Sequence, residues 1–230
     1  MKTKIWIYLL IVMGFVIILN NSCKKDGDNG SNTVTDIDGN VYHTITVGTQ
    51  VWMVENLKVT KYSNGDGIPN ITDNTQWGNL ITGAYCNNNN LTNANAYGRL
   101  YNEYAVNDSR NLAPTGWHVA TAAEFDELIT YLGGTNVGGG KMKEAGNSHW
   151  VNPNTGATNE SSFTALPGGF RSNDGTFIDV GDIGIWWSST EYIADNVWYY
   201  EMNYNDTYVH KVSSFKGGGF SVRCIRDNAI

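Results

Sequence analysis

A chain of 230 residues with 15 basic and 22 acidic side chains lacks the basic face that phosphate binding requires, so we expect no nucleic-acid partner. Only 16% of the residues are charged, whereas 26 are glycine, eight are tryptophan and 13 are tyrosine. This composition is typical of an exported, loop-rich protein with neutral polar surfaces, and the length allows one fair-sized domain.

The amino terminus predicts a secretory signal peptide over residues 1–22. Two lysines precede the apolar stretch 5–19, and the polar, glycine-rich stretch 24–33 follows soon after it. A basic region, a short apolar region and a small residue at the cleavage point are typical of such signals. The apolar stretch is too short for a transmembrane helix, which needs about 20 residues.

Cys23 comes directly after the small residue Ser22, with the aliphatic Leu19 a few positions upstream, as in the signals of bacterial lipoproteins. We therefore expect lipid on Cys23, a flexible tether over residues 23–35, and an envelope protein anchored in the outer membrane. The membrane is then a partner through the lipid. The alternative is an ordinary signal peptide cut nearby, with Cys23 as a spare thiol.

The first structured segment is predicted to be a β-hairpin. Asp38-Gly39 supplies a turn, and residues 41–47 alternate apolar and polar side chains at the period of a strand. The chain returns in residues 51–54. Residues 61–95 are rich in Asn, Gly and Thr, so we expect long loops there.

Two helices are expected next. Four apolar residues with i, i+3, i+4 and i+7 spacing predict a helix from about Ala94 to Val106. The same spacing recurs from Phe125 to Leu132, where the capping box of Thr121 and Glu124 marks the start and Gly133-Gly134 marks the end.

The carboxyl-terminal half returns to strands and tight turns. The expected strands lie within residues 163–171, 176–178, 185–190, 197–204, 208–212 and 220–225. Strands, then helices, then strands, without βαβ alternation, predict an α+β domain built on mainly antiparallel sheet.

Two cysteines remain once Cys23 carries lipid. Cys86 and Cys224 allow only one pairing, and an oxidising compartment favours a disulfide between them. Two free buried thiols are the alternative.

Six segments of the chain together resemble a known family. They are DGNVYHTITVGTQVWMVENLKVTKYSNGDGIPN, AYGRLYNEYAV, PTGWHVATAAEFDELITYLGG, SSFTALPGGFR, WWSSTEY and GFSVRCIRD. They resemble the Fibrobacter succinogenes major paralogous domain family, which is common in exported proteins of Bacteroidetes and Fibrobacteres. The similarity covers roughly residues 36–227. The resemblance implies one domain over residues 36–230 with a C-type lectin-like fold, two short helices and a twisted antiparallel sheet, and it implies little about activity.

Catalytic and metal motifs are missing from the sequence, so we expect a non-catalytic protein without metal or cofactor. The four histidines are scattered and lack zinc-ligand spacing. The run 138–141 departs from the phosphate-loop pattern and is expected to be a loop. The calcium motifs of sugar-binding lectins are absent, although four aspartates could supply oxygen ligands elsewhere or simply form turns. Glu191 and Glu201 are candidates for a glycosidase pair without diagnostic spacing, which leaves a carbohydrate-active enzyme as a further alternative.

The candidate binding face lies in residues 186–210, where aromatic and amide side chains mix. Such side chains give a large contact area at low entropic cost. We expect the loop residues to be exposed and one or more of the tryptophans to lie beneath or beside them; the alternative places the tryptophans in the core. The candidate residues are Asn203, Tyr204, Asn205, Asp206, Tyr208, Trp186, Trp187 and Trp198.

We therefore expect a cell-envelope lipoprotein that displays a binding module for glycan or protein ligands, as in adhesion. The alternative is a structural or assembly component of the envelope that recognises no soluble ligand.

Overall fold

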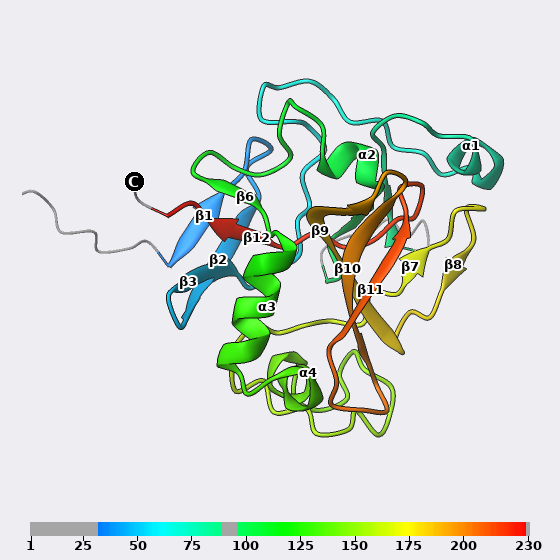
Figure 1. Cartoon of the computed structure of the whole chain (residues 1–230). Helices are drawn as coiled ribbons and strands as arrows, with labels where there is room; N and C mark the ends of the chain where they lie inside the picture. The colour runs from blue at the N-terminus through cyan, green and yellow to red at the C-terminus, as the bar shows by residue number, and fades with distance from the viewer. Residues whose placement is uncertain (1–31, 89–95, 229–230) are drawn as a thin grey trace, which may run out of the picture. The chain divides into compact units, whose positions relative to one another are not determined.

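The largest sheet of the described ranges has five strands, three from the amino-terminal part of the chain, one from its middle and one from its carboxyl-terminal end. They follow the order β1-β2-β3-β12-β6, and neighbouring strands are antiparallel. The carboxyl-terminal strand thus lies between β3 and β6 (Figure 1). The strands are β1 (Thr33–Thr35), β2 (Val41–Val47), β3 (Gln50–Met53), β12 (Cys224–Arg226) and β6 (Trp117–Val119). The predicted first hairpin is confirmed, with β2 over the expected seven residues.

The computed structural model describes residues 32–88 and 96–228. The expected signal peptide, Cys23 and most of the expected tether lie outside these ranges. Residues 33–35, the end of the expected tether, are strand β1 paired with β2, so a flexible tether is wrong for them. The chain from Asn32 onward is one compact unit. Within the described ranges, no helix is long and apolar enough to span a membrane.

A second, three-stranded antiparallel sheet carries the aromatic segment. It consists of β9 (Ile183–Ile193), β10 (Asn196–Asn203) and β11 (His210–Phe215), with β10 in the centre. The remaining named strands form two short two-stranded sheets. They pair β4 (Tyr85–Asn87) with β5 (Arg99–Tyr101), and β7 (Phe170–Arg171) with β8 (Phe177–Ile178).

Four helices lie in the described ranges, namely α1 (Asn74–Gly78), α2 (Glu103–Val106), α3 (Ala122–Tyr131) and α4 (Thr135–Met142). The capping box predicted for α3 is present: Thr121 Oγ1 accepts from the Glu124 amide, and the Glu124 carboxylate accepts from the Thr121 amide. Figure 1 shows α3 between the five-stranded sheet and the β9–β11 sheet. The α+β class with mainly antiparallel sheets is therefore confirmed.

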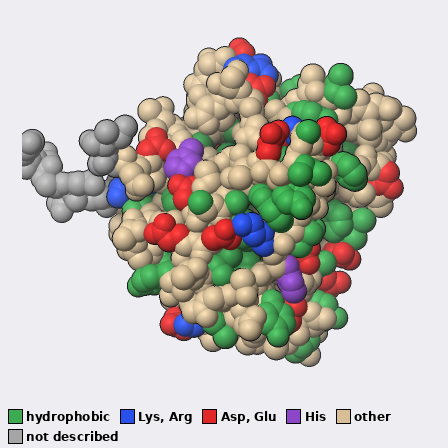
Figure 2. All heavy atoms as spheres, in the orientation of Figure 1, with side chains coloured by type: hydrophobic (Ala, Val, Ile, Leu, Met, Phe, Trp, Pro, Cys, Tyr) green, Lys and Arg blue, Asp and Glu red, His purple; other side chains and the backbone are tan. Residues whose placement is uncertain are grey.

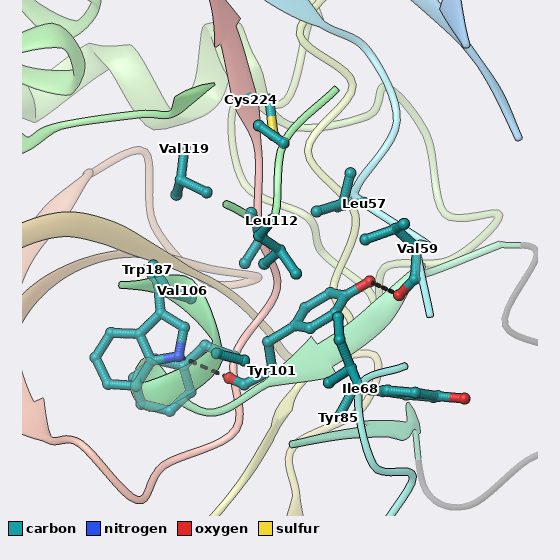
Figure 3. Close-up of a cluster of buried hydrophobic side chains, with 14 of the residues drawn as sticks. Leu57, Val59, Ile68, Tyr85, Tyr101, Val106, Leu112, Val119, Trp187 and Cys224 are labelled. Carbon is teal, nitrogen blue, oxygen red and sulfur yellow. Dashed lines mark hydrogen bonds between the residues drawn. The ribbon is translucent and has the colours of Figure 1, made fainter. Parts of the chain in front are cut away.

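The β9–β11 sheet separates two large hydrophobic cores, because successive side chains on a strand point to opposite faces. Trp186 lies in the core beneath α3, and the adjacent Trp187 lies in the other core, against Tyr101. Figure 3 shows this second group, in which Tyr101 Oη donates to the backbone oxygen of Val59 over 2.7 Å and Trp187 Nε1 donates to that of Tyr101 over 2.8 Å.

The helix expected from about Ala94 to Val106 is wrong over most of its length. Residues 99–101 are strand β5, and only the four residues of α2 are helical; residues 89–95 lie outside the described ranges. The apolar spacing reflects two other contacts. Leu100 packs beside Cys86 in a small cluster, and Tyr101 belongs to the core around Trp187. The expected loops at 61–95 also contain α1 and β4.

The predicted Cys86–Cys224 disulfide is also wrong: both cysteines are free and buried. Cys86 lies with Trp77 in the small cluster beside α1, whereas Cys224 lies in the core shown in Figure 3. The two thiols therefore lie in different hydrophobic clusters and do not pair. Burial raises the pKa of Cys86 to about 12 and that of Cys224 further still.

Candidate functional site

The loop that joins β10 to β11 carries four of the candidate residues, Tyr204, Asn205, Asp206 and Tyr208, and a fifth, Asn203, ends β10. It lies beside α4, at the end of the β10–β11 hairpin that is lowest in Figure 1. Its backbone is held from two sides. The Gly140 amide donates to the Thr207 oxygen, and the Thr155 amide donates to the Tyr204 oxygen over 2.7 Å.

Lys143 holds the interior of this loop. Its side chain is fully buried, and its ammonium donates to the backbone oxygens of Thr155, Asn203 and Asp206 over 3.1, 2.9 and 2.7 Å. The ammonium also lies 5.3 Å from the centre of the Trp150 ring. Burial lowers the pKa of Lys143 to about 8, and the nearby Asp206 charge opposes this shift. Three carbonyl oxygens thus replace water around one buried cation.

Helix α4 contains the run of glycines that the sequence analysis expected to be a loop, so that expectation is wrong. The glycines allow neighbouring backbone to approach the helix. A Cβ on Gly139 would collide with the Tyr208 oxygen, and one on Gly140 would lie 2.5 Å from the Gly156 oxygen. The helix is therefore the surface on which the β10–β11 loop rests.

The loop side chains divide into exposed and anchored groups. Tyr208 is 44% exposed, and Asn205 is exposed as well. Asp206 is engaged within the loop: its carboxylate accepts from the Tyr208 amide over 2.8 Å and lies 3.2 Å from His210 Nε2. Tyr204 packs against the core beneath α3, contrary to the expectation that the loop side chains are all exposed.

A family model described as the Fibrobacter succinogenes major domain matches residues 45–226, which include every strand from β3 to β12. The chain belongs to this family. No curated protein and no solved structure matches it. The match spans the whole candidate loop, α4 and Lys143, so these features belong to the family domain of this chain.

Two of the three candidate tryptophans belong to the core of this Fibrobacter succinogenes major domain. Trp186 and Trp187 have no exposed surface, so neither can touch a ligand at the surface. Trp186 Nε1 donates to Asn56 Oδ1 over 2.8 Å. Trp198 is half-buried, with its ring centre 4.4 Å from that of Tyr192 and 5.0 Å from the Lys211 ammonium. Figure 2 shows hydrophobic surface beside a basic group over β10 and β11.

All four histidines of the chain lie beside acidic side chains. Each of the four histidines lies within 3.2 Å of a carboxylate oxygen. His118 lies between Glu124 and Asp227, at 2.8 and 2.6 Å, and these carboxylates raise its pKa to about 9. Within residues 32–88 and 96–228, no group of three or more His, Cys, Asp or Glu side chains is arranged to hold a metal.

Sequence reasoning missed Lys143, which decides the conformation of the loop. Lys141 and Lys143 flank Met142 in a polar segment, and neither has a signal that distinguishes a buried lysine from an exposed one. Only the approach of three backbone oxygens from residues 155–206 makes Lys143 an interior cation.

Proposed function

We propose that this domain is a non-catalytic binding module that contacts a glycan or protein ligand through the β10–β11 loop. The observation that carries the proposal is the fixed backbone of the loop. Lys143 and α4 hold it from within, while Tyr208 and Asn205 face solvent. A rigid loop with one exposed aromatic ring and amide groups loses little entropy on binding, which is the usual advantage of a preorganised recognition loop.

The proposal includes the location and the fold. The signal-like amino terminus and Cys23 support a lipid-anchored protein of the cell envelope, with the residues between Cys23 and strand β1 as the tether. The resemblance of the sequence to its family supports a C-type lectin-like arrangement, and the antiparallel sheets with short helices agree with it. The domain then stands outside the cytoplasm, where loops on a rigid scaffold commonly carry recognition.

The test is a binding screen of the purified protein on a glycan array and on immobilised envelope and host-surface proteins. Tyr208→Ala and Asn205→Ala should weaken any specific binding at least tenfold and leave the melting temperature within about 2 °C, because both side chains are exposed. Tyr131→Ala is the matched control, since Tyr131 is 66% exposed and lies on α3.

Two results would contradict the proposal. One is specific binding that survives unchanged in both loop variants, which would move the site elsewhere. The other is the absence of specific binding to any glycan or protein in the screen, which would favour a structural component of the envelope.

A further inference from the structure

We propose that the surface around Tyr104 is a second binding site, which takes a neutral oligosaccharide. Two hollows meet at this residue, with volumes of about 390 and 280 Å³. Tyr104 lines both of them, and the two neighbouring hollows are together called here the Tyr104 groove. Each volume lies close to the lower end of the range of about 300–1,000 Å³ that is usual for small-ligand pockets.

The Tyr104 groove is distinct from the β10–β11 loop. Asn196, at the start of β10, pairs with Phe215, which lines the second hollow. The candidate loop begins after Asn203, at the other end of β10. Figure 1 shows α2, which carries Tyr104, at the end of the β9–β11 sheet opposite to α4. This inference therefore does not rest on the function proposed for the loop.

Apolar side chains form part of both hollows. Ile81 borders the first hollow and is 80% exposed, and Phe215 borders the second and is 60% exposed. Tyr104, which lines both hollows, is partly exposed. Large apolar side chains at the surface of a pocket mark binding sites more often than chance. The carbon–hydrogen faces of sugar rings pack on such aromatic and aliphatic surfaces, one ring in each hollow.

The polar wall of the first hollow is preorganised. Arg110 donates to the Asp108 carboxylate through Nε and Nη2, both over 2.8 Å, and its Nη1 lies 3.2 Å from Asp66. Its guanidinium also stacks over the Tyr62 ring, 4.0 Å from the ring centre. These bonds use three of the five N–H groups of an arginine. The fixed guanidinium and carboxylate can then donate to and accept from the hydroxyls of a sugar without reorganisation.

The charge of the groove decides the class of ligand. The second hollow contains Lys216, which donates to Glu191 over 2.5 Å and also faces the carboxylates of Glu103 and Asp195. Carboxylates thus outnumber cations around both hollows, which disfavours anionic ligands such as phosphates and acidic sugars. The cations that are present already pair with carboxylates. A neutral, hydroxyl-rich ligand needs no broken ion pair, whereas a basic peptide would have to compete with Arg110 and Lys216.

The experiment titrates the purified protein with neutral hexasaccharides of glucose, mannose, xylose and N-acetylglucosamine. It follows binding by calorimetry and by amide chemical shifts of the isotope-labelled protein. A Lys/Arg-rich decapeptide and inorganic polyphosphate are the charged probes. We expect at least one hexasaccharide to bind and to shift the amides of residues 81–83, 103–110 and 215–217.

Matched variants separate this groove from the loop. Tyr104→Leu should weaken hexasaccharide binding at least tenfold, and Tyr104→Phe should change it less than threefold, because the ring is kept. Tyr131→Ala should leave binding unchanged, since Tyr131 does not line the groove. Tyr208→Ala tests the loop separately. The shift map needs no variant, so it decides the location even if Tyr104→Leu fails to fold.

Three outcomes would overturn the inference. They are no binding by any of the neutral hexasaccharides, binding whose shifts lie outside the groove, and binding of the basic peptide or polyphosphate in preference to every hexasaccharide. Loss of hexasaccharide binding in Tyr208→Ala with full binding in Tyr104→Leu would instead assign the sugar to the β10–β11 loop.

Discussion

Lys143 Nζ lies 2.7 Å from the backbone oxygen of Asp206, although 63 residues separate the two in sequence. This bond, with those to Asn203 and Thr155, makes a lysine the internal support of the β10–β11 loop. A buried ammonium is costly unless its donors are satisfied, and here three carbonyl oxygens accept from it. The candidate loop thus owes its shape to a residue that no ligand would touch.

Lys143→Met should destabilise the protein by about 1–3 kcal/mol, because the three backbone oxygens lose their donor in a dry interior. Lys141→Met is the control. Lys141 makes a long 3.5 Å ion pair with the exposed Glu160, so its loss should cost less than about 0.5 kcal/mol. Urea unfolding measures the free energy of unfolding of both variants. In Lys143→Met, the amide hydrogens of residues 203–208 should also exchange faster than in the native protein. Equal stabilities of the two variants would contradict this role.

Gly139→Ala should destabilise the protein by about 1–3 kcal/mol, since its methyl group would collide with the Tyr208 backbone oxygen. Gly138→Ala is one residue away and should be neutral or stabilising, by up to about 1 kcal/mol. There the methyl group meets Val209 at an ordinary 3.5 Å, and alanine favours the helix. Thermal melting of both variants tests the packing of α4 against the loop. The reverse order of stability would show that the loop does not rest on this face.

The stability contributed by His118 should depend on pH. Its pKa is about 9 in the folded protein, whereas an unperturbed histidine, as in the unfolded chain, has a pKa of 6.5. The folded protein therefore binds the proton more tightly. The contribution is fully present below pH 6.5 and is lost as the pH rises through 9. Because the side chain is 37% exposed, solvent screening reduces its size to about 1 kcal/mol.

His118→Gln should remove this pH dependence. Urea unfolding at pH 6 and pH 8 measures the pH dependence of the free energy of unfolding. Lys143 has a lowered pKa of about 8, so its titration makes the folded protein more stable as the pH rises, which is opposite to the effect of His118. The window from pH 6 to pH 8 lies below most of that titration. The native protein should lose stability between the two values relative to the variant. Parallel behaviour of the two proteins would show that the Glu124 and Asp227 contacts do not hold the proton.

Cys86 and Cys224 should both be alkylated when the protein is unfolded without reductant, because they are free thiols in separate clusters. In the folded protein both should resist alkylation at pH 8, since burial raises the pKa of each well above that pH. Peptide mapping by mass spectrometry gives the result. A cross-linked pair of peptides would contradict the structure.

Cys23→Ala should abolish lipid attachment and release the protein from the membrane fraction of expressing cells. The physical reason is that the acyl chains on Cys23 would be the anchor, and the polar residues that follow it bind membranes weakly. Metabolic labelling with a tagged fatty acid and membrane fractionation measure both effects. Ser31→Ala, within the expected tether, is the control. Unchanged labelling of Cys23→Ala would show that lipid is attached elsewhere or not at all.

Local patterns predicted the elements whose side chains repeat within one segment. The alternation in residues 41–47 and the capping box at Thr121 and Glu124 correspond to β2 and α3, because period and caps are local properties of the chain. The same reasoning failed at Arg99–Tyr101, where apolar residues with helical spacing form a strand. Leu100 and Tyr101 point to opposite faces of this strand and pack in two different hydrophobic clusters.

The sequence by itself determined the α+β class, the family and the segment in which the candidate loop lies. Only the tertiary structure decided which of its residues face solvent. Neighbouring strand residues such as Trp186 and Trp187 enter opposite cores, and Tyr204 packs inward while Tyr208 stays exposed. Burial depends on which distant segments cover each face. The support of the loop by Lys143 likewise arises from carbonyl oxygens that come together only in the folded chain.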